Sequence, residues 1–356
     1  MSKVGILTLG LRCNYGGILQ AAALYNFLKD ENFDPVLIRK YPIKKGWRNI
    51  VVSCLERIPL QNIKGYRLNY LKYLNNINFF NQYISNQTNI MFHKYEIENY
   101  LQSSNINSLI VGSDQVWRYN YINDGEYDTY FLNFNLNKKI NKIAYAASFG
   151  IDKWEISSEN LNIHNYLSDF SAISVRENSA KVICEKDFKI SDVEIVLDPT
   201  LLVDISFYLN MIKNTIVKES QLITYILDKN QEKEDLINRE KLKYNSYFDL
   251  LNDESIISIE HWVSSFYNAD FIITDSFHGM VFSILFNKQF IVILNQERGT
   301  DRFNSLCEIL DLKDRLLKTG TKIPEDLKEI DYDSINHKLF ELRKESREFL
   351  LNSLKK

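Results

Sequence analysis

The chain alternates short apolar segments with segments of helical periodicity, and this alternation constrains its fold more than any other feature. Val4–Leu9, Leu222–Leu227 and Phe271–Thr274 have the length and apolarity of buried strands. Between such runs lie segments with apolar residues every three or four positions, among them Ile18–Leu28 and Ile259–Asn268. Strands that alternate with helices predict parallel sheets covered on both faces.

The same pattern continues over most of the 356 residues, which is more than one ordinary sheet requires. We therefore expect two Rossmann-like domains, 1–167 and 168–330, followed by a C-terminal helix over 331–356. The other predicted elements are the strands Pro35–Ile38, Ser108–Gly112, Lys142–Ala147, Ala172–Val175, Val193–Leu197 and Phe290–Leu294, a helix near Asn160–Leu167, and an aromatic helical insertion over Gly65–Tyr83.

Composition excludes several classes of protein. The net charge is −3, and lysines and acids are mixed along the chain without the basic stripe of a nucleic-acid-binding protein. No apolar run approaches the roughly 18 to 20 residues of a membrane helix, and a strand begins at once, so we expect no signal peptide. The four cysteines, none in a C-x-x-C spacing, suggest neither zinc nor disulfides and favour a cytoplasmic location: Cys13, Cys54, Cys184 and Cys307.

The segment Thr274–Ser283 places His278 where a predicted strand ends and a core helix begins. In open α/β sheets, ligands bind outside the carboxyl ends of the strands, and a helix N-terminus attracts anions. His278 is therefore a candidate functional residue. A core histidine satisfied by a backbone carbonyl is the alternative.

Two further clusters follow strands in the first half. Asn14, Tyr15 and the paired Gly16 and Gly17 follow the first strand, where glycines permit a tight turn and close ligand approach. This loop lacks the G-x-G-x-x-G and P-loop fingerprints, so a plain turn is an equal alternative. Gly112–Trp117 follows another strand.

Within that second cluster, Asp114 and Gln115 could bind sugar hydroxyls while the indole of Trp117 covers an apolar sugar face. The alternative is a helix N-cap next to a core tryptophan.

Three arginines also lie at predicted strand ends. Arg176 follows Val175, and Arg298 and Arg302 follow the strand that ends at Leu294. Each could direct a bidentate fork at a carboxylate or phosphate, or could simply pair with a neighbouring acid. Five polar clusters on five strand ends together favour a ligand-binding cleft between two domains.

Several motifs resemble the polysaccharide pyruvyl transferase family. They are V-G-I-L-T-L followed by N-Y-G-G, then V-G-S-D-Q-V-W, A-Y-A-A-S-F-G, S-V-R-E, L-D-P-T-L-L and T-D-S-F-H-G, in the family's order from about Val4 to about Leu312. The resemblance implies a GT-B-like architecture with two Rossmann-like domains. It also implies transfer of a pyruvyl group from phosphoenolpyruvate to hydroxyls of a cell-surface polysaccharide precursor, which leaves a pyruvate ketal.

The resemblance also implies residue roles. His278 corresponds to the family's acid/base histidine, and Arg176 to a phosphoenolpyruvate ligand in the S-V-R-E segment. Ser276 stands where characterised members often have an arginine, so Arg298 or Arg302 would supply that charge. Contacts to the acceptor are expected from the first half, through Asn14, Tyr15, Asp114, Gln115 and Trp117.

No cofactor beyond the donor substrate is expected, and no metal, because Asp198 and Asp275 have no further ligand at metal-binding spacing. The expected partners are phosphoenolpyruvate and a glycan or lipid-linked sugar, the latter implying association with the inner face of the membrane. Two alternatives stay open. One is a metal-independent GT-B glycosyltransferase that uses a nucleotide sugar, and the other is a catalytically idle glycan-binding protein.

Overall fold

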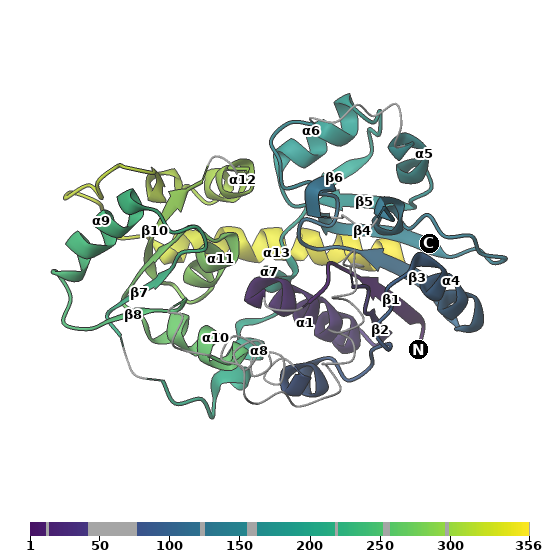
Figure 1. Cartoon of the computed structure of the whole chain (residues 1–356), viewed down its shortest axis with the longest axis horizontal. Coiled ribbons are helices and arrows are strands. Elements are labelled where there is room, and N and C mark those ends of the chain that lie inside the picture. The colour runs from purple at the N-terminus through teal and green to yellow at the C-terminus, as the bar shows by residue number, and fades with distance from the viewer. Residues whose placement is uncertain are drawn as a thin grey trace, which may run out of the picture. The chain divides into compact units, whose positions relative to one another are not determined.

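The computed structural model describes residues 1–11, 14–41, 77–121, 125–154, 162–217, 220–251, 257–295 and 299–355. The chain forms two compact units (Figure 1). The first comprises Met1–Leu202 with Glu345–Lys356, and the second comprises Val203–Lys344. Each unit contains one parallel sheet, so the predicted α/β class with two parallel sheets is confirmed.

The first unit is built on a six-stranded sheet of order β2-β1-β3-β4-β5-β6. Four of the five residues of β1 and of β2 are buried, as expected for parallel strands covered on both faces. The strands are β1 (Lys3–Leu7), β2 (Asp34–Ile38), β3 (Ile106–Val111), β4 (Asn141–Ala147), β5 (Ala172–Val175) and β6 (Val193–Ile195).

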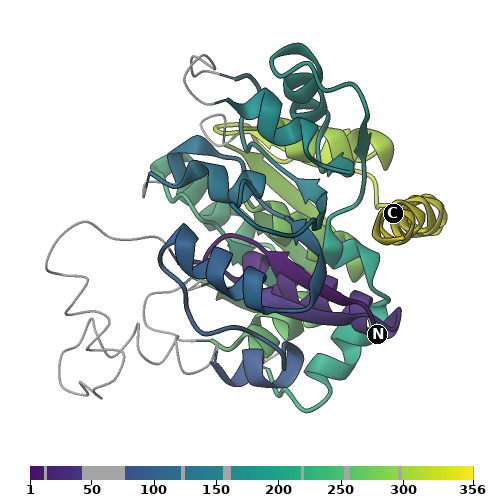
Figure 2. The same cartoon turned by 90° about the vertical axis from the view of Figure 1, so that its right-hand side faces the viewer.

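Helix α1 (Tyr15–Asp30) is almost wholly buried because its centre, Ala21–Leu24, is apolar on every side. It packs against β2 and against α7 (Pro199–Leu202). Helix α1 and strands β1 and β2 are the purple elements of Figures 1 and 2. Further helices of this unit include α4 (Lys94–Ser103), α5 (Ile163–Ser168), α6 (Asn178–Lys186) and α7 (Pro199–Leu202), with short 3-10 turns at Tyr119–Tyr121 and Tyr127–Phe131.

The second unit is built on a five-stranded sheet of order β11-β10-β9-β7-β8. Its strands are β7 (Leu222–Tyr225), β8 (Tyr247–Asp249), β9 (Phe271–Thr274), β10 (Gln289–Leu294) and β11 (Leu316–Lys318). Its helices are α8 (Ile205–Ile212), α9 (Gln231–Lys241), α10 (Ile259–Asn268), α11 (Phe277–Leu285), α12 (Asp301–Ile309) and the first part of α13 (Tyr332–Leu354), with a 3-10 turn at Lys313–Arg315.

Both sheets have the same internal topology. When the strands of each unit are counted in chain order, both sheets contain the arrangement 2-1-3-4-5. In such sheets the chain leaves the first and third strands in opposite directions, and ligands bind in the crevice that this reversal opens at the carboxyl ends. The topology therefore points to the ends of β1 and β3 in the first unit, and of β7 and β9 in the second.

The division between the units differs from the predicted boundary at 167/168. Strands β5 and β6 continue the first sheet, with Ala172 in register with Ile143 of β4, and the first unit extends to Leu202. Arg176 consequently belongs to the first unit, whereas His278 belongs to the second.

The predicted aromatic insertion is helical at residues 77–83, and its remainder up to residue 76 lies outside the described residues. The C-terminal helix begins at Tyr332, close to the prediction, and its residues from Glu345 onward count with the first unit. None of the helices in the described ranges combines the length and apolarity needed to cross a membrane.

Candidate functional site

The loops after β1 and β3 meet at the carboxyl edge of the first sheet, between the two strands from which the chain leaves in opposite directions. We call this point the strand reversal of the first unit. The Asn14 Nδ2 atom donates a hydrogen bond to Asp114 Oδ2 at 3.4 Å. The Thr8 hydroxyl donates to the Ser113 carbonyl at 3.2 Å. Gln20 of α1 joins both loops, since its amide donates to Thr8 and accepts from the Ser113 N–H, each at 3.0 Å. Two of the predicted clusters are thus brought together. Gln20 links them by hydrogen bonds, and sequence reasoning did not identify this residue.

Tyr15, Gly16 and Gly17 form the first turn of α1, whose N-cap is Asn14. A Cβ atom on Gly17 would lie 3.0 Å from Asn14 Nδ2, so the glycine makes room for the asparagine side chain over the helix start. Gly17 therefore leaves the space in which the Asn14 side chain reaches Asp114.

Arg176, at the end of β5, is buried among three carboxylates. Its Nη1 donates to Asp198 Oδ2 at 2.9 Å, and its Nη2 and Nε lie 3.6 Å from Asp114 Oδ1 and Glu177 Oε2. Burial alone would lower the pKa of Arg176, but the charges of Asp198, Glu177 and Asp114 outweigh it and raise this pKa above its usual value. The guanidinium is therefore held firmly in its charged form.

This environment differs from the role expected for Arg176. A ligand for phosphoenolpyruvate needs a guanidinium whose fork points at the donor, and here the fork is directed at protein carboxylates. Asp198 also accepts hydrogen bonds from the Ser113 hydroxyl at 2.9 Å and the Thr200 N–H at 3.0 Å. Arg176 thus acts in the first unit as a link between the loops after β3, β5 and β6.

Two other predicted contacts are placed differently from expectation. Trp117 is fully buried; its indole N–H donates to the Tyr130 carbonyl at 2.9 Å, and its ring stacks on Phe131 with a centroid distance of 5.4 Å. It covers no sugar, and the core alternative is correct for this residue. Gln115 is also buried, and its side-chain oxygen accepts from Arg118 Nη1 at 2.7 Å.

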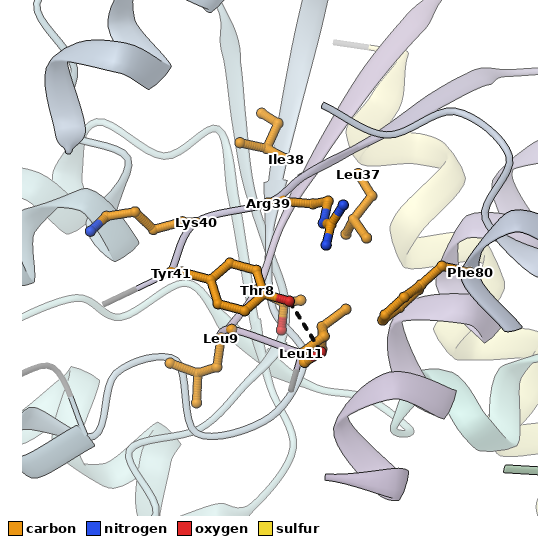
Figure 3. Close-up of a pocket in the computed structure, with 10 residues that line it drawn as sticks. Thr8, Leu9, Leu11, Leu37, Ile38, Arg39, Lys40, Tyr41 and Phe80 are labelled. Carbon is orange, nitrogen blue, oxygen red and sulfur yellow. Dashed lines mark hydrogen bonds between the residues drawn. The ribbon is translucent and has the colours of Figure 1, made fainter. Parts of the chain in front are cut away.

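A pocket lies at the ends of β1 and β2 in the first unit (Figure 3). The space between its lining residues is about 230 Å³, a volume that includes open solvent, so the pocket is a shallow depression and not a closed cavity. Figure 3 shows the guanidinium of Arg39 on the side of Phe80, with the ring of Tyr41 facing it across the pocket. The Tyr41 hydroxyl donates to the Leu11 carbonyl at 3.2 Å, which fixes that ring. The next residue, Lys40, also lines the pocket, but its side chain points away from the Arg39 guanidinium.

In the second unit, Asp275 joins the loops after β7 and β9. Its carboxylate accepts from the N–H groups of Leu227 and Asp228 at 2.6 and 3.0 Å, and from Lys233 Nζ at 2.7 Å. Both charged side chains are almost fully buried, with exposed fractions of 0% for Asp275 and 2% for Lys233. This buried ion pair holds the strand reversal of the second unit together, and sequence reasoning did not identify Lys233.

Ser276 is the N-cap of α11 and places His278 in the first turn. The Ser276 hydroxyl accepts from the Gly279 N–H at 3.4 Å, and its own N–H donates to Thr274 Oγ1 at 3.0 Å. A Cβ atom on Gly279 would lie 2.3 Å from Thr274 Oγ1, so only glycine allows the helix to start this close to β9. His278 lies in this turn with 6% of its surface exposed.

The loop after β10 adds the remaining candidates of the second unit. The Asn295 amide donates to Asp228 Oδ2 at 2.8 Å, which connects this loop to the one after β7. Arg302, in the first turn of α12, is buried with its guanidinium carbon 5.0 Å from the Phe303 ring centroid. Arg298 lies outside the described residues. Among the residues that the structure describes, no three His, Cys, Asp or Glu side chains are grouped to hold a metal ion.

Comparison with known families identifies the group to which this sequence is related. The polysaccharide pyruvyl transferase profile matches residues 14–297, which include the candidate residues from Asn14 to His278. The chain belongs to the polysaccharide pyruvyl transferase family. No curated protein sequence shows significant similarity to it.

Solved structures similar to this family member include UDP-GlcNAc 2-epimerase from Neisseria meningitidis, with a TM-score of 0.50, 11% identity and 99% of each chain covered. S. aureus MnaA, solved with UDP, has a TM-score of 0.51 and 13% identity, with 97% of this chain and 88% of that chain covered. At these identities the likeness concerns the fold alone, and it confirms the predicted GT-B-like architecture.

Proposed function

We propose that this protein transfers the pyruvyl group of phosphoenolpyruvate to two hydroxyls of a polysaccharide precursor, which yields a cyclic pyruvate ketal and inorganic phosphate. Membership of the polysaccharide pyruvyl transferase family supports this reaction class. The observation that carries the proposal within the structure is His278, held in the first turn of α11 at the strand reversal of the second unit. A ligand at that crevice would meet both the imidazole and the helix N-terminus.

The proposed reaction places a proton donor at the enol carbon. Protonation of that carbon gives an oxocarbenium-like centre, which the first sugar hydroxyl attacks. The bond to the phosphate oxygen then breaks, and the second hydroxyl closes the ketal. One hydroxyl proton balances the new methyl group, and the other leaves with the phosphate. Imidazole suits these transfers because its ordinary pKa lies near neutral pH.

The donor carries a carboxylate and a phosphate, so its site needs cationic or N–H donors. Arg176 is engaged with three carboxylates, those of Asp198, Glu177 and Asp114. We therefore propose that Arg302 and the N-terminus of α11 bind the anionic groups of phosphoenolpyruvate instead. Arg298 remains a second candidate from the same loop. Ser276 caps α11, a task that the arginine often found at this position in the family could not perform.

The acceptor is assigned to the first unit. Asn14 and Asp114 offer an amide and a carboxylate at the strand reversal, and both groups can hydrogen-bond sugar hydroxyls. The proposed chemistry requires no metal, since arginine and a helix terminus meet the charge of the donor, and we expect full activity in EDTA. We place the reaction in the cytoplasm, where phosphoenolpyruvate is formed.

The proposal is tested by incubating the full-length protein with ¹³C-labelled phosphoenolpyruvate and glycans extracted from its source organism. The expected result is phosphate release together with a pyruvyl mass increase that carries the label. Activity that EDTA abolishes and magnesium or manganese restores would overturn the metal-free assignment while leaving the transfer itself in place.

A parallel thermal-shift comparison of phosphoenolpyruvate with UDP-sugars separates the proposal from the glycosyltransferase alternative. A ligand at about 100 times its dissociation constant stabilises the native state by roughly 2.7 kcal/mol. Stabilisation by a UDP-sugar alone, with no labelled product from phosphoenolpyruvate, would contradict the pyruvyl transfer.

A further inference from the structure

Arg39 follows β2 directly and lines the pocket at the ends of β1 and β2 (Figure 3). Its guanidinium carbon lies 5.8 Å from the ring centroid of Tyr41 and 5.9 Å from that of Phe80. The side chain is half-buried, so water screens its charge less than that of a surface arginine. Two aromatic rings thus hold one cation at the wall of a pocket.

Arg39 differs from its neighbours in its ion pairing within the described part of the chain. Among the described residues, no carboxylate lies within ion-pair distance of its guanidinium. By contrast, the adjacent Lys40 lies 3.1 Å from Glu126, and Lys94 lies 2.6 Å from Asp128. A half-buried cation at a pocket wall, with no ion-pair partner among the residues that the structure describes, favours an anionic ligand.

The position of the pocket relates it to the proposed acceptor site. Strand β1 has β2 on one side and β3 on the other, so Arg39 and Asp114 follow the two strands that flank β1. Neighbouring strands lie about 4.8 Å apart, which puts the ends of β2 and β3 roughly 10 Å from each other. A sugar whose hydroxyls meet Asp114 could therefore present a substituent to Arg39.

We infer that this pocket binds an anionic substituent of the acceptor, a phosphate or a carboxylate, through the guanidinium of Arg39. The faces of Tyr41 and Phe80 form the apolar walls beside it. The inference rests on the proposed function, since it specifies the class of acceptor: a glycosyl phosphate or an acidic sugar rather than a neutral one.

Calorimetry with the full-length protein tests this assignment without the donor. Glucose 1-phosphate, glucuronic acid and glucose are titrated in turn, so that the first two probes separate phosphate from carboxylate. At least one charged sugar is expected to bind about tenfold more tightly than glucose, a difference of about 1.4 kcal/mol.

The matched variants are Arg39→Gln, Arg39→Lys and Arg347→Gln. Arg39→Gln should abolish the preference for the charged sugar, and Arg39→Lys should keep part of it, since lysine retains the charge without the fork. Arg347 belongs to the same unit but pairs with Glu31, so Arg347→Gln removes one positive charge away from the pocket and should preserve the preference. An unchanged thermal midpoint in each variant shows that the fold is intact.

Equal binding of charged and neutral sugars by the native protein, or an equal loss in Arg39→Gln and Arg347→Gln, would overturn the inference. So would an Arg39→Gln variant that loses affinity for phosphoenolpyruvate and not for the sugars, because the pocket would then belong to the donor. Pyruvyl transfer in the labelled assay without any Arg39-dependent preference defeats only this inference. The preference without transfer defeats only the proposed reaction.

Discussion

His278 and Arg176 both follow strands at the carboxyl edge of a sheet, yet their surroundings give them different tasks. Arg176 is surrounded by the carboxylates of Asp198, Glu177 and Asp114, and its Nη1 atom donates a hydrogen bond to Asp198. His278 stands in the first turn of a capped helix, where the backbone around it is fixed by Ser276 and Gly279. The first arrangement maintains structure, and the second suits a group that must act on a substrate.

Replacing His278 with alanine is expected to reduce turnover at least about 100-fold, the usual contribution of general acid–base catalysis. Phosphoenolpyruvate affinity and the thermal midpoint should change little, because the imidazole lies in the first turn of a helix that Ser276 caps. Phosphate release measures turnover, and calorimetry measures donor binding. His261→Ala, a half-buried histidine of the same unit, is the matched control and should stay active. A His278→Ala variant that keeps more than about a tenth of native turnover would remove this residue from the proton transfer.

Replacing Arg176 with methionine is expected to destabilise the protein by about 3 to 5 kcal/mol, because buried carboxylates then lose their cation. Urea unfolding measures the loss. Arg347→Gln, which breaks the partly exposed pair with Glu31, should cost under about 1 kcal/mol. Donor affinity should remain near native in the folded Arg176 variant. A folded variant with weakened phosphoenolpyruvate binding would instead restore Arg176 as a donor ligand.

For single residues, sequence reasoning located the polar groups but not the residues that they contact. The end of β5 could be predicted from the apolar run Ala172–Val175, and with it the position of Arg176. The acids that neutralise it come from separate segments, and only folding brings Asp114 and Asp198 to it. Trp117 could not be placed from the sequence either, since a tryptophan after a strand can face a ligand or the core. In the structure it stacks on Phe131 and donates a hydrogen bond to the Tyr130 carbonyl within the core.

At the scale of helices, strands and loops, a few buried hydrogen bonds and ion pairs hold the loops and the starts of helices in place. In the second unit Asp275 connects the end of β9 to two N–H groups after β7 and to Lys233 of α9. Because His278 lies three positions further on, this carboxylate also positions the start of α11. The geometry of the candidate site therefore depends on a group that need not touch a substrate.

Asp275→Asn is expected to destabilise the protein by about 3 to 5 kcal/mol, since it leaves the buried Lys233 ammonium without its counter-charge. Urea unfolding again measures the change, and turnover should fall because the start of α11 loses its support. Asp249→Asn breaks the partly exposed pair with Lys229 and should cost under about 1 kcal/mol. Equal losses of unfolding free energy in the two variants would show that the buried Asp275–Lys233 pair contributes no more than the partly exposed one.

Elements with a marked apolar run or helical periodicity could be predicted from the sequence, and elements without one could not. The runs Ala172–Val175 and Phe271–Thr274 are strands with the predicted bounds, and the predicted helix Ile259–Asn268 is α10. Strands β8 and β11 were missed because each has three residues and lies in no longer apolar run, whereas the equally short β6 lies within the predicted run Val193–Leu197. The predicted 167/168 boundary precedes two strands that extend the first sheet, and pairing between distant strands leaves no local signal.

Across the whole molecule, the two units share one strand order and differ in the chemistry of the strand reversal. In the first unit that point carries Asp114 and Asn14, groups suited to hydroxyls. In the second it carries His278 and the N-terminus of α11, and Arg302 follows the neighbouring strand β10. The chemistry of the two units therefore favours acceptor binding in the first and donor binding in the second.

Two substitutions, one in each unit, test this division of labour. Asp114→Asn should weaken acceptor binding and leave phosphoenolpyruvate affinity unchanged, because the lost charge belongs to the first unit. Arg302→Gln should lower phosphoenolpyruvate affinity about tenfold or more, as expected for a hydrogen bond to a charged group, and leave acceptor binding unchanged. Calorimetry with one substrate at a time measures each affinity. In the double variant both losses should appear at their single-variant size, since sites without shared partners act independently. A loss of phosphoenolpyruvate affinity in Asp114→Asn as large as that in Arg302→Gln would mean that the first unit also binds the donor, and the assignment of one substrate to each unit would fail.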